Sequence, residues 1–208
     1  METVQFQHLT VSRLILGSNP FSGFSHQSPE MDQTMRHYFT TARIKETLRQ
    51  AESLGVNTLI ARADFHVMRM LMEYRDEGGT LQWFAQTCPE VGSHEACILR
   101  AEDHGAKACH LHGGVMDNAF AQGKLDDVQP ALDLIRSRGM LAGIAAHNHR
   151  VIEWAEEHLD LDYYLDLVRS LKSALPDVTL KCFTASEVHH ITKLSGLTTS
   201  VFSKPLGL

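Results

Sequence analysis

Short apolar runs alternate with longer stretches in which apolar residues recur at helical spacing. The helical period is clearest in residues 42–55, where Ile44, Leu48 and Ala51 fall on one stripe. Thr40 or Thr41 is the expected N-cap of this helix, and Gly55 is its expected end. The apolar runs between such stretches have the length and composition of buried strands. The pattern therefore indicates a chain of alternating strands and helices.

The same order of strand, helix and glycine recurs along the first three quarters of the chain. Alternation of this kind predicts a parallel sheet with right-handed crossovers and helices packed outside it. The strands are expected at residues 13–19, 57–64, 81–87, 108–112 and 141–147. The helices that follow them are expected at residues 42–55, 65–79, 93–104, 126–138 and 150–159.

Two regions depart from this order. Residues 20–39 are rich in Pro, Ser, Gly, His and Gln, and predict a long loop. Residues 162–175 are most simply a second helix after the fifth unit, with a short strand at 161–165 as the alternative. A further strand at 178–184 and a helix at 186–194 follow. Because a complete eight-unit barrel usually needs roughly 250 residues, the chain predicts an α/β, TIM-barrel-like (β/α) fold that is incomplete or rearranged.

Composition supports one globular α/β domain over residues 1–208. Of the 208 residues, 43% are apolar and 21% charged, and the net charge is −6. Since no basic run is present, nucleic acid is not an expected partner. No apolar stretch reaches the ~18 residues of a membrane span, and the first residues lack a signal-peptide pattern. We therefore expect a cytoplasmic protein with a small-molecule substrate, in which the four cysteines are free thiols because none has CxxC spacing.

Most of the chain resembles an uncharacterised bacterial TIM-barrel family. The resemblance covers residues 13–164 and is carried by long stretches, which include LILGSNPFSGFSHQ, TTARIKETLRQAESLGVNT, GAKACHLHGG and AAHNHRVIEWAEEHLDLDYY. It implies a barrel fold and no particular activity.

A second resemblance covers residues 161–196. LDYYLDLVRSLKSALPDVTLKCFTASEVHHITKLSG is similar to an internal segment of the radical-SAM enzymes related to aminofutalosine synthase and FO synthase. The two resemblances meet near residues 162–164, so the alternative to one domain is a composite of residues 1–160 and 161–208. Radical-SAM enzymes hold their [4Fe–4S] cluster with a CxxxCxxC loop. The four cysteines here lack that spacing, so no iron–sulfur cluster is expected.

Polar side chains gather where the expected strands end, which is where barrel enzymes build their sites. Residues two apart in a strand share a face, and this relation joins Arg62 with Asp64, His110 with His112, and His147 with His149. The candidate catalytic residues are Asp64, His112 and His147, and the candidate substrate-binding residues are Asn19, Arg62, Gln86 and Lys181. Arg62 is suited to an anionic group of the substrate.

Two chemistries are open for this cluster. His110, His112 and His147 could ligate a divalent metal such as Zn or Mn, or they could serve as hydrogen-bonded rim groups in acid–base chemistry. Lys181 offers a third route, a Schiff base with a carbonyl substrate.

Two smaller features also have two interpretations. Gly113 and Gly114 could let backbone N–H groups approach an anion, or they could form a loop that needs positive φ. His189 and His190, adjacent on an expected helix, are more typical of a surface than of a ligand pair.

Three functions remain open from the sequence. The first is a barrel enzyme that acts on a small polar or anionic substrate by His/Asp acid–base or metal-assisted chemistry, as a hydrolase, lyase or isomerase. The second is a non-catalytic barrel fragment, and the third is a relic of a menaquinone or deazaflavin biosynthetic enzyme without its cluster. An incomplete barrel leaves an open sheet edge, so we also expect self-association through that edge.

Overall fold

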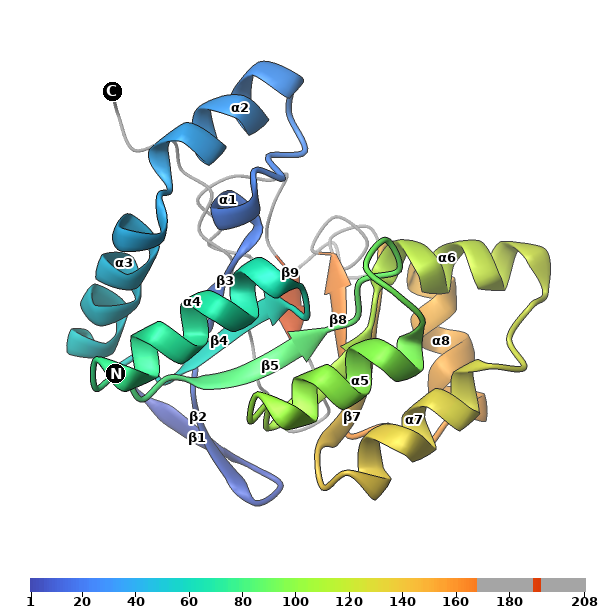
Figure 1. Cartoon of the computed structure of the whole chain (residues 1–208). Helices are drawn as coiled ribbons and strands as arrows, with labels where there is room; N and C mark the ends of the chain where they lie inside the picture. Colours follow the sequence, from blue (N-terminus) through green and yellow to red (C-terminus); the bar gives the residue numbers. More distant parts are fainter. Residues whose placement is uncertain (168–188, 192–208) are drawn as a thin grey trace, which may run out of the picture.

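Six parallel strands, β3 to β8, curl around a common interior, and β9 is antiparallel to β8 at the end of the sheet (Figure 1). The computed structural model describes residues 1–167 and 189–191. The strands of this sheet are β3 (Leu16–Gly17), β4 (Thr58–Arg62), β5 (Gln82–Gln86), β6 (Ala108–Leu111), β7 (Leu141–Ala146), β8 (Tyr163–Leu167) and β9 (His189–Ile191). The first five strands expected from the sequence are therefore present and parallel, which confirms an incomplete (β/α) barrel.

Helices cover the outer side of the curled sheet (Figure 1). Those that follow the expected positions are α3 (Thr41–Ser53), α4 (Phe65–Asp76), α5 (His94–Asp103), α7 (Val128–Ser137) and α8 (His149–His158). Thr40 is the N-cap of α3, where its hydroxyl accepts from the Arg43 N–H. Gly55 follows the same helix with φ 85°, a conformation that glycine adopts without strain.

Alternation along each strand separates an outer core from an inner one. Leu59, Ala61 and Leu111 face the outer helices, whereas Ile60 and Phe84 face the interior. Since side chains alternate along a strand, Arg62 and Gln86 fall on the inner side, two residues beyond Ile60 and Phe84. The sequence thus places Arg62 and Gln86 on the inner side at the carboxyl ends of β4 and β5.

An antiparallel hairpin of β1 (Thr3–Phe6) and β2 (Leu9–Ser12) covers the amino ends of the strands. Asn57, just before β4, accepts from the Ser12 N–H at 2.8 Å and donates to the Thr10 carbonyl at 2.9 Å. Gln82, which begins β5, donates to the same carbonyl at 2.8 Å. This hairpin, which was not predicted from the sequence, fills the interior with Phe6 and Val11.

Residues 20–39 are not the long loop that their composition predicted. They contain most of α1 (Asn19–Ser22) and all of α2 (Pro29–Tyr38). The Ser28 hydroxyl accepts from the Met31 N–H, and Pro29 occupies the first helical turn, where a missing N–H costs nothing. This cap and proline, rather than an apolar stripe, explain the helix, since α2 buries none of its residues.

The helix predicted at 162–175 is wrong for its first part, and the alternative strand is correct. Tyr163 begins β8, and Gly143 of the neighbouring strand leaves room for its ring, since a Cβ there would lie 2.7 Å from the Tyr163 ring. The helix predicted at 186–194 is likewise wrong at His189–Ile191, which form β9. The strand predicted at 178–184 lies outside the described residues.

Within the described residues, none of the helices is long and apolar enough to cross a membrane. Among the described residues, β3 and β9 are the two ends of the order of strands in the seven-stranded sheet. Self-association through an open edge therefore stays a prediction.

Candidate functional site

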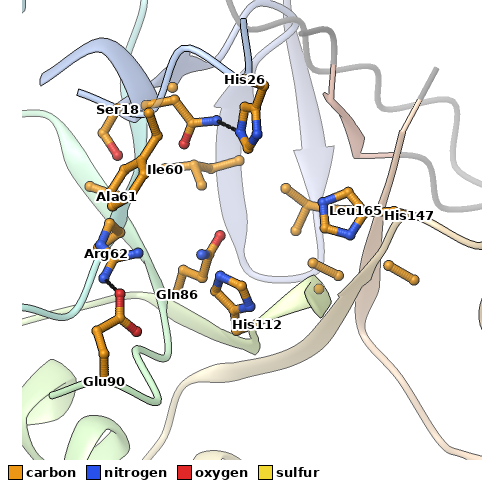
Figure 2. Close-up of a pocket in the computed structure, with 16 residues that line it drawn as sticks. Ser18, His26, Ile60, Ala61, Arg62, Gln86, Glu90, His112, His147 and Leu165 are labelled. Atoms are coloured by element: carbon orange, nitrogen blue, oxygen red, sulfur yellow. Dashed lines mark hydrogen bonds and ion pairs between the residues drawn. The ribbon is translucent and has the colours of Figure 1, made fainter. Parts of the chain in front are cut away.

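A pocket of about 250 Å³ lies at the carboxyl ends of the parallel strands. Each of the strands from β3 to β8 supplies lining residues from its own end or from the residues just after it (Figure 2). Five of the candidate catalytic and substrate-binding residues line it, and these are Asn19, Arg62, Gln86, His112 and His147.

The remaining candidates are placed elsewhere. Asp64 and His110 lie beside the pocket, behind the residues that line it. His149 begins α8 with an exposed side chain, so it does not share a strand face with His147. Lys181 lies outside the described residues.

Arg62 is nearly buried, with 8% of its surface exposed, and carboxylates lie on two sides of it. Its Nε donates to Asp64 at 3.1 Å, and a terminal nitrogen donates to Glu90, which follows β5 (Figure 2). The Phe24 ring lies over the guanidinium, 4.8 Å from Cζ to the ring centroid. Burial opposes the charge of Glu90, but hydrogen bonds to it and the charge of Arg62 outweigh that effect and lower its pKa. Glu90 is therefore a carboxylate at neutral pH.

Asp64 has a structural task besides its ion pair. It is the N-cap of α4, and its carboxylate accepts from the Val67 N–H at 2.9 Å. These two bonds fix the Asp64 carboxylate against both α4 and Arg62. Asp64 therefore influences the pocket by orienting the Arg62 side chain.

His110 joins the pocket wall to the buried interior. Its Nδ1 lies 3.1 Å from the Tyr163 hydroxyl, and its Nε2 lies 3.4 Å from the Gln86 carbonyl oxygen. An amide oxygen can only accept, so this arrangement puts the His110 proton on Nε2 and leaves Nδ1 to accept from Tyr163. Burial raises the pKa of Tyr163 well above its usual value, which keeps the hydroxyl a donor. The pair holds Gln86 with its NH2 group toward the pocket.

His112 is the N-cap of α6 (Gly113–Gln122). Its Nδ1 accepts from the Gly114 N–H at 3.1 Å, which requires the ring proton to be on Nε2. Burial lowers the pKa of His112, and the positive charge of Arg62 lowers it further, against the opposing effects of Glu90 and Asp117. At neutral pH, His112 is thus an uncharged donor at the wall of the pocket.

His147 follows β7 and is held by Asp117 of α6. Its Nδ1 lies 2.7 Å from Asp117 Oδ2, and its backbone N–H donates to the same carboxylate at 3.1 Å. The Asn148 N–H donates to Asp117 Oδ1 at 3.2 Å. A carboxylate can only accept, so Nδ1 carries a proton and Nε2 bears the lone pair in the neutral ring. His112 and His147 are therefore fixed in opposite tautomers at one pocket.

Gly113 and Gly114 begin α6, and neither has positive φ, so the alternative of a loop that needs positive φ is wrong. A Cβ on Gly113 would lie 3.0 Å from His147 Cε1, and one on Gly114 would lie 3.3 Å from His112 Cε1. The two glycines make room for the two imidazole rings.

His26 and Asn19 form the part of the pocket nearest α1. Asn19 Nδ2 lies 3.3 Å from His26 Nε2 (Figure 2). His26 has φ 54°, a left-handed conformation that is uncommon for residues other than glycine and is often found at functional sites.

The three histidines proposed as metal ligands do not form a ligand cluster. Within the described part of the chain, no group of three or more His, Cys, Asp or Glu side chains is placed to hold a metal. His110 directs its two ring nitrogens toward Tyr163 and Gln86, and this is why it does not join His112 and His147.

Several residues of the site were not identified from the sequence, among them Asp117, Glu90, Phe24 and His26. Asp117 lies between the strand expected at 108–112 and the helix expected at 126–138, where no element was predicted. The spacing of one helical turn from Gly113 brings it to the same end of α6. Glu90 and Phe24 lie in connections after β5 and α1, where no periodic pattern marks them. A helix expected over 113–122 would have revealed Asp117 as a neighbour of His147.

Two curated proteins match short stretches of the chain, and no protein-family model matches it. Aminodeoxyfutalosine synthase of Streptomyces coelicolor is 42% identical over 50 residues, which are 24% of this chain and 13% of that protein. The enzyme of the same name from Thermus thermophilus is 54% identical over 35 residues, 17% of this chain. The chain thus spans 13% and 9% of the lengths of the two relatives.

Solved structures share the fold. An aldo-keto reductase from Bacillus halodurans in its holo form superposes with a TM-score of 0.53 at 13% sequence identity, over 77% of this chain and 55% of that chain. An aldolase gives a TM-score of 0.44 over 58% of this chain. At 13% identity, the likeness to the reductase establishes a common barrel architecture and no more.

Proposed function

We propose that this protein is a barrel enzyme that transfers protons on a small polar or anionic substrate bound at the carboxyl ends of β3 to β8. The observation that carries the proposal is the pair of histidines in opposite tautomers at one pocket. Concerted proton transfer needs one group that accepts a proton and another that donates one, and this pair supplies both.

His147 is the proposed general base. Asp117 accepts its Nδ1 proton, which directs the Nε2 lone pair to the opposite side of the ring and stabilises the imidazolium formed when Nε2 takes a proton. The two backbone N–H groups on the same carboxylate hold Asp117 in place as the ring changes charge.

His112 is the proposed hydrogen-bond donor, or general acid. Its lowered pKa keeps it neutral, and a neutral imidazole with its proton on Nε2 polarises a substrate oxygen without attracting a counter-ion. Arg62, Gln86 and Asn19 then position the substrate, and Asp64 positions Arg62. The geometry gives more support to this acid–base chemistry than to metal-assisted chemistry, because His110 faces Tyr163 and Gln86.

The reaction class is tested by hydrogen–deuterium exchange at carbon. The protein is incubated in D2O with small keto- and hydroxycarboxylates, and loss of C–H signals beside the carbonyl or hydroxyl carbon is followed by proton NMR. We expect His147→Ala to slow exchange by about 10²- to 10⁴-fold, the usual contribution of a general base. His149→Ala is the matched control, since His149 is an exposed histidine two residues away.

Three results would contradict the proposal. Equal exchange rates in the native protein and in His147→Ala would show that His147 is not the general base. Equal losses in His147→Ala and His149→Ala would indicate a general effect of the substitutions. Absence of exchange with every compound would favour the non-catalytic barrel fragment.

A further inference from the structure

We propose that the pocket recognises a carboxylate group, which binds Arg62 in place of the Glu90 carboxylate. The inference rests on the proposed function and names the class of substrate for the same site. In the absence of substrate, the Glu90 side chain occupies the carboxylate-binding position on Arg62, and the substrate displaces it.

Arg62 is already oriented for a planar anion. Asp64 fixes its Nε, and the Phe24 ring lies against its face, so the guanidinium cannot rotate without losing both contacts. Within the described residues, two of the five N–H donors of Arg62 make side-chain hydrogen bonds, one to Asp64 and one to Glu90. A fixed guanidinium edge matches the two oxygens of a carboxylate.

The two carboxylates on Arg62 differ in how firmly they are held. The side chain of Asp64 is 17% exposed and caps α4, so it stays in place when a ligand binds. The side chain of Glu90 is 52% exposed and lies in the connection between β5 and α5. Exposed ion pairs contribute little to stability, so Glu90 is the member of the set that a ligand can replace.

Donors on the pocket wall complete the site for oxygen atoms. The Gln86 carbonyl oxygen accepts from His110, so the Gln86 NH2 group remains to donate into the pocket. Nδ1 of His112 accepts from the Gly114 N–H, so the His112 Nε2–H remains to donate there as well. Gln86, His112 and Arg62 thus present donors to one small volume (Figure 2). Such a set suits a carboxylate with a further oxygen on the next carbon.

The balance of charge makes exchange with Glu90 necessary. Arg62 carries one positive charge and is paired with two negative ones. A third anion beside Glu90 would add like-charge repulsion at short range, whereas an anion that replaces Glu90 leaves the total unchanged. The ligand is therefore a competitor of the Glu90 side chain.

The test is an NMR titration of the full chain with acetate, with acetamide as the neutral isostere, and with inorganic phosphate. The Arg62 Nε–H, the Gln86 NH2 and the Gly113 N–H are the reporters. We expect acetate to shift these signals and acetamide to leave them in place. Glu90→Gln should bind acetate about 2- to 5-fold more tightly, the value of an exposed ion pair. Glu95→Gln is the matched control, since it removes the same charge from an exposed position of α5 and should leave the affinity unchanged.

The outcomes separate this inference from the proposed function. Equal responses to acetate and acetamide, phosphate binding without acetate binding, or equal affinities in the native protein and both glutamine variants would overturn it. A Glu90→Ala variant repeats the comparison if the glutamine retains its own bond to Arg62. In His147→Ala, acetate should bind as before. Acetate binding without carbon-bound exchange in the native protein would contradict the acid–base proposal alone.

Discussion

At the amino ends of the parallel strands, the interior is filled by the rings of Phe6, Phe84 and Tyr163, whose centroids lie 5.7 to 6.4 Å apart. At the carboxyl ends, the same interior opens into a pocket bounded by Arg62 and His112. His110 and Tyr163 join the two regions through one hydrogen bond. The comparison assigns stability to the aromatic end and chemistry to the polar end, so substitutions at the two ends should have separable effects.

The largest effect on stability is expected from Phe6→Ala. Phe6 is 2% exposed, and its loss leaves a cavity beneath two aromatic rings that the hairpin cannot close. We expect the free energy of unfolding in urea to fall by about 3–5 kcal/mol. Phe65→Ala is the control, because Phe65 is 66% exposed and its contact with Arg100 accounts for about 1 kcal/mol or less. Similar losses in both variants would mean that the hairpin does not close the interior.

A smaller effect is expected from Tyr163→Phe, which removes only the hydroxyl that joins the two regions. His110 Nδ1 would lose its buried donor, at a cost of about 1–3 kcal/mol in the free energy of unfolding. Because His110 holds Gln86, the NMR signals of the Gln86 NH2 should shift as well. A loss of stability with unchanged Gln86 signals would show that the two ends are independent.

Gly113→Ala is expected to disturb the pocket with little effect on stability. The added Cβ would press on His147 Cε1, while alanine is a better helix former than glycine by about 1 kcal/mol. The free energy of unfolding should change by less than about 1 kcal/mol, and the His147 ring signals should shift. Unchanged His147 signals would contradict the close packing of the glycine against the ring.

The smallest expected effect is on the titration of His112. In a pH titration followed by NMR, its midpoint should lie below the ordinary histidine value of 6.5, and it should fall further in Glu90→Gln, since the charge of Glu90 raises it. A histidine with a lowered pKa in the folded state binds its proton more readily when unfolded. The stability contributed by the neutral ring is therefore present above pH 6.5 and is lost as the pH falls through the folded pKa. A midpoint above 6.5 would contradict the neutral donor.

The sequence predicted which strand ends surround the site better than it predicted the hydrogen bonds within the site. The expected strand ends placed Arg62, Gln86, His112 and His147 at the same end of the barrel, where all four line the pocket. Asp117 was missed because GGVMDN has the composition of a loop, although tertiary packing makes it the first turn and a half of α6. The His147 tautomer depends on a hydrogen bond to Asp117, 30 positions away, which no local pattern contains.

The central claim is that His112 and His147 line one pocket in opposite tautomers. Two-bond ¹⁵N–¹H correlation spectra of the native protein at neutral pH measure this directly, because protonated and unprotonated ring nitrogens have well-separated ¹⁵N shifts. The account predicts the proton on Nε2 for His112 and on Nδ1 for His147. The same tautomer in both rings would leave the site without its donor–acceptor pair and would contradict the account.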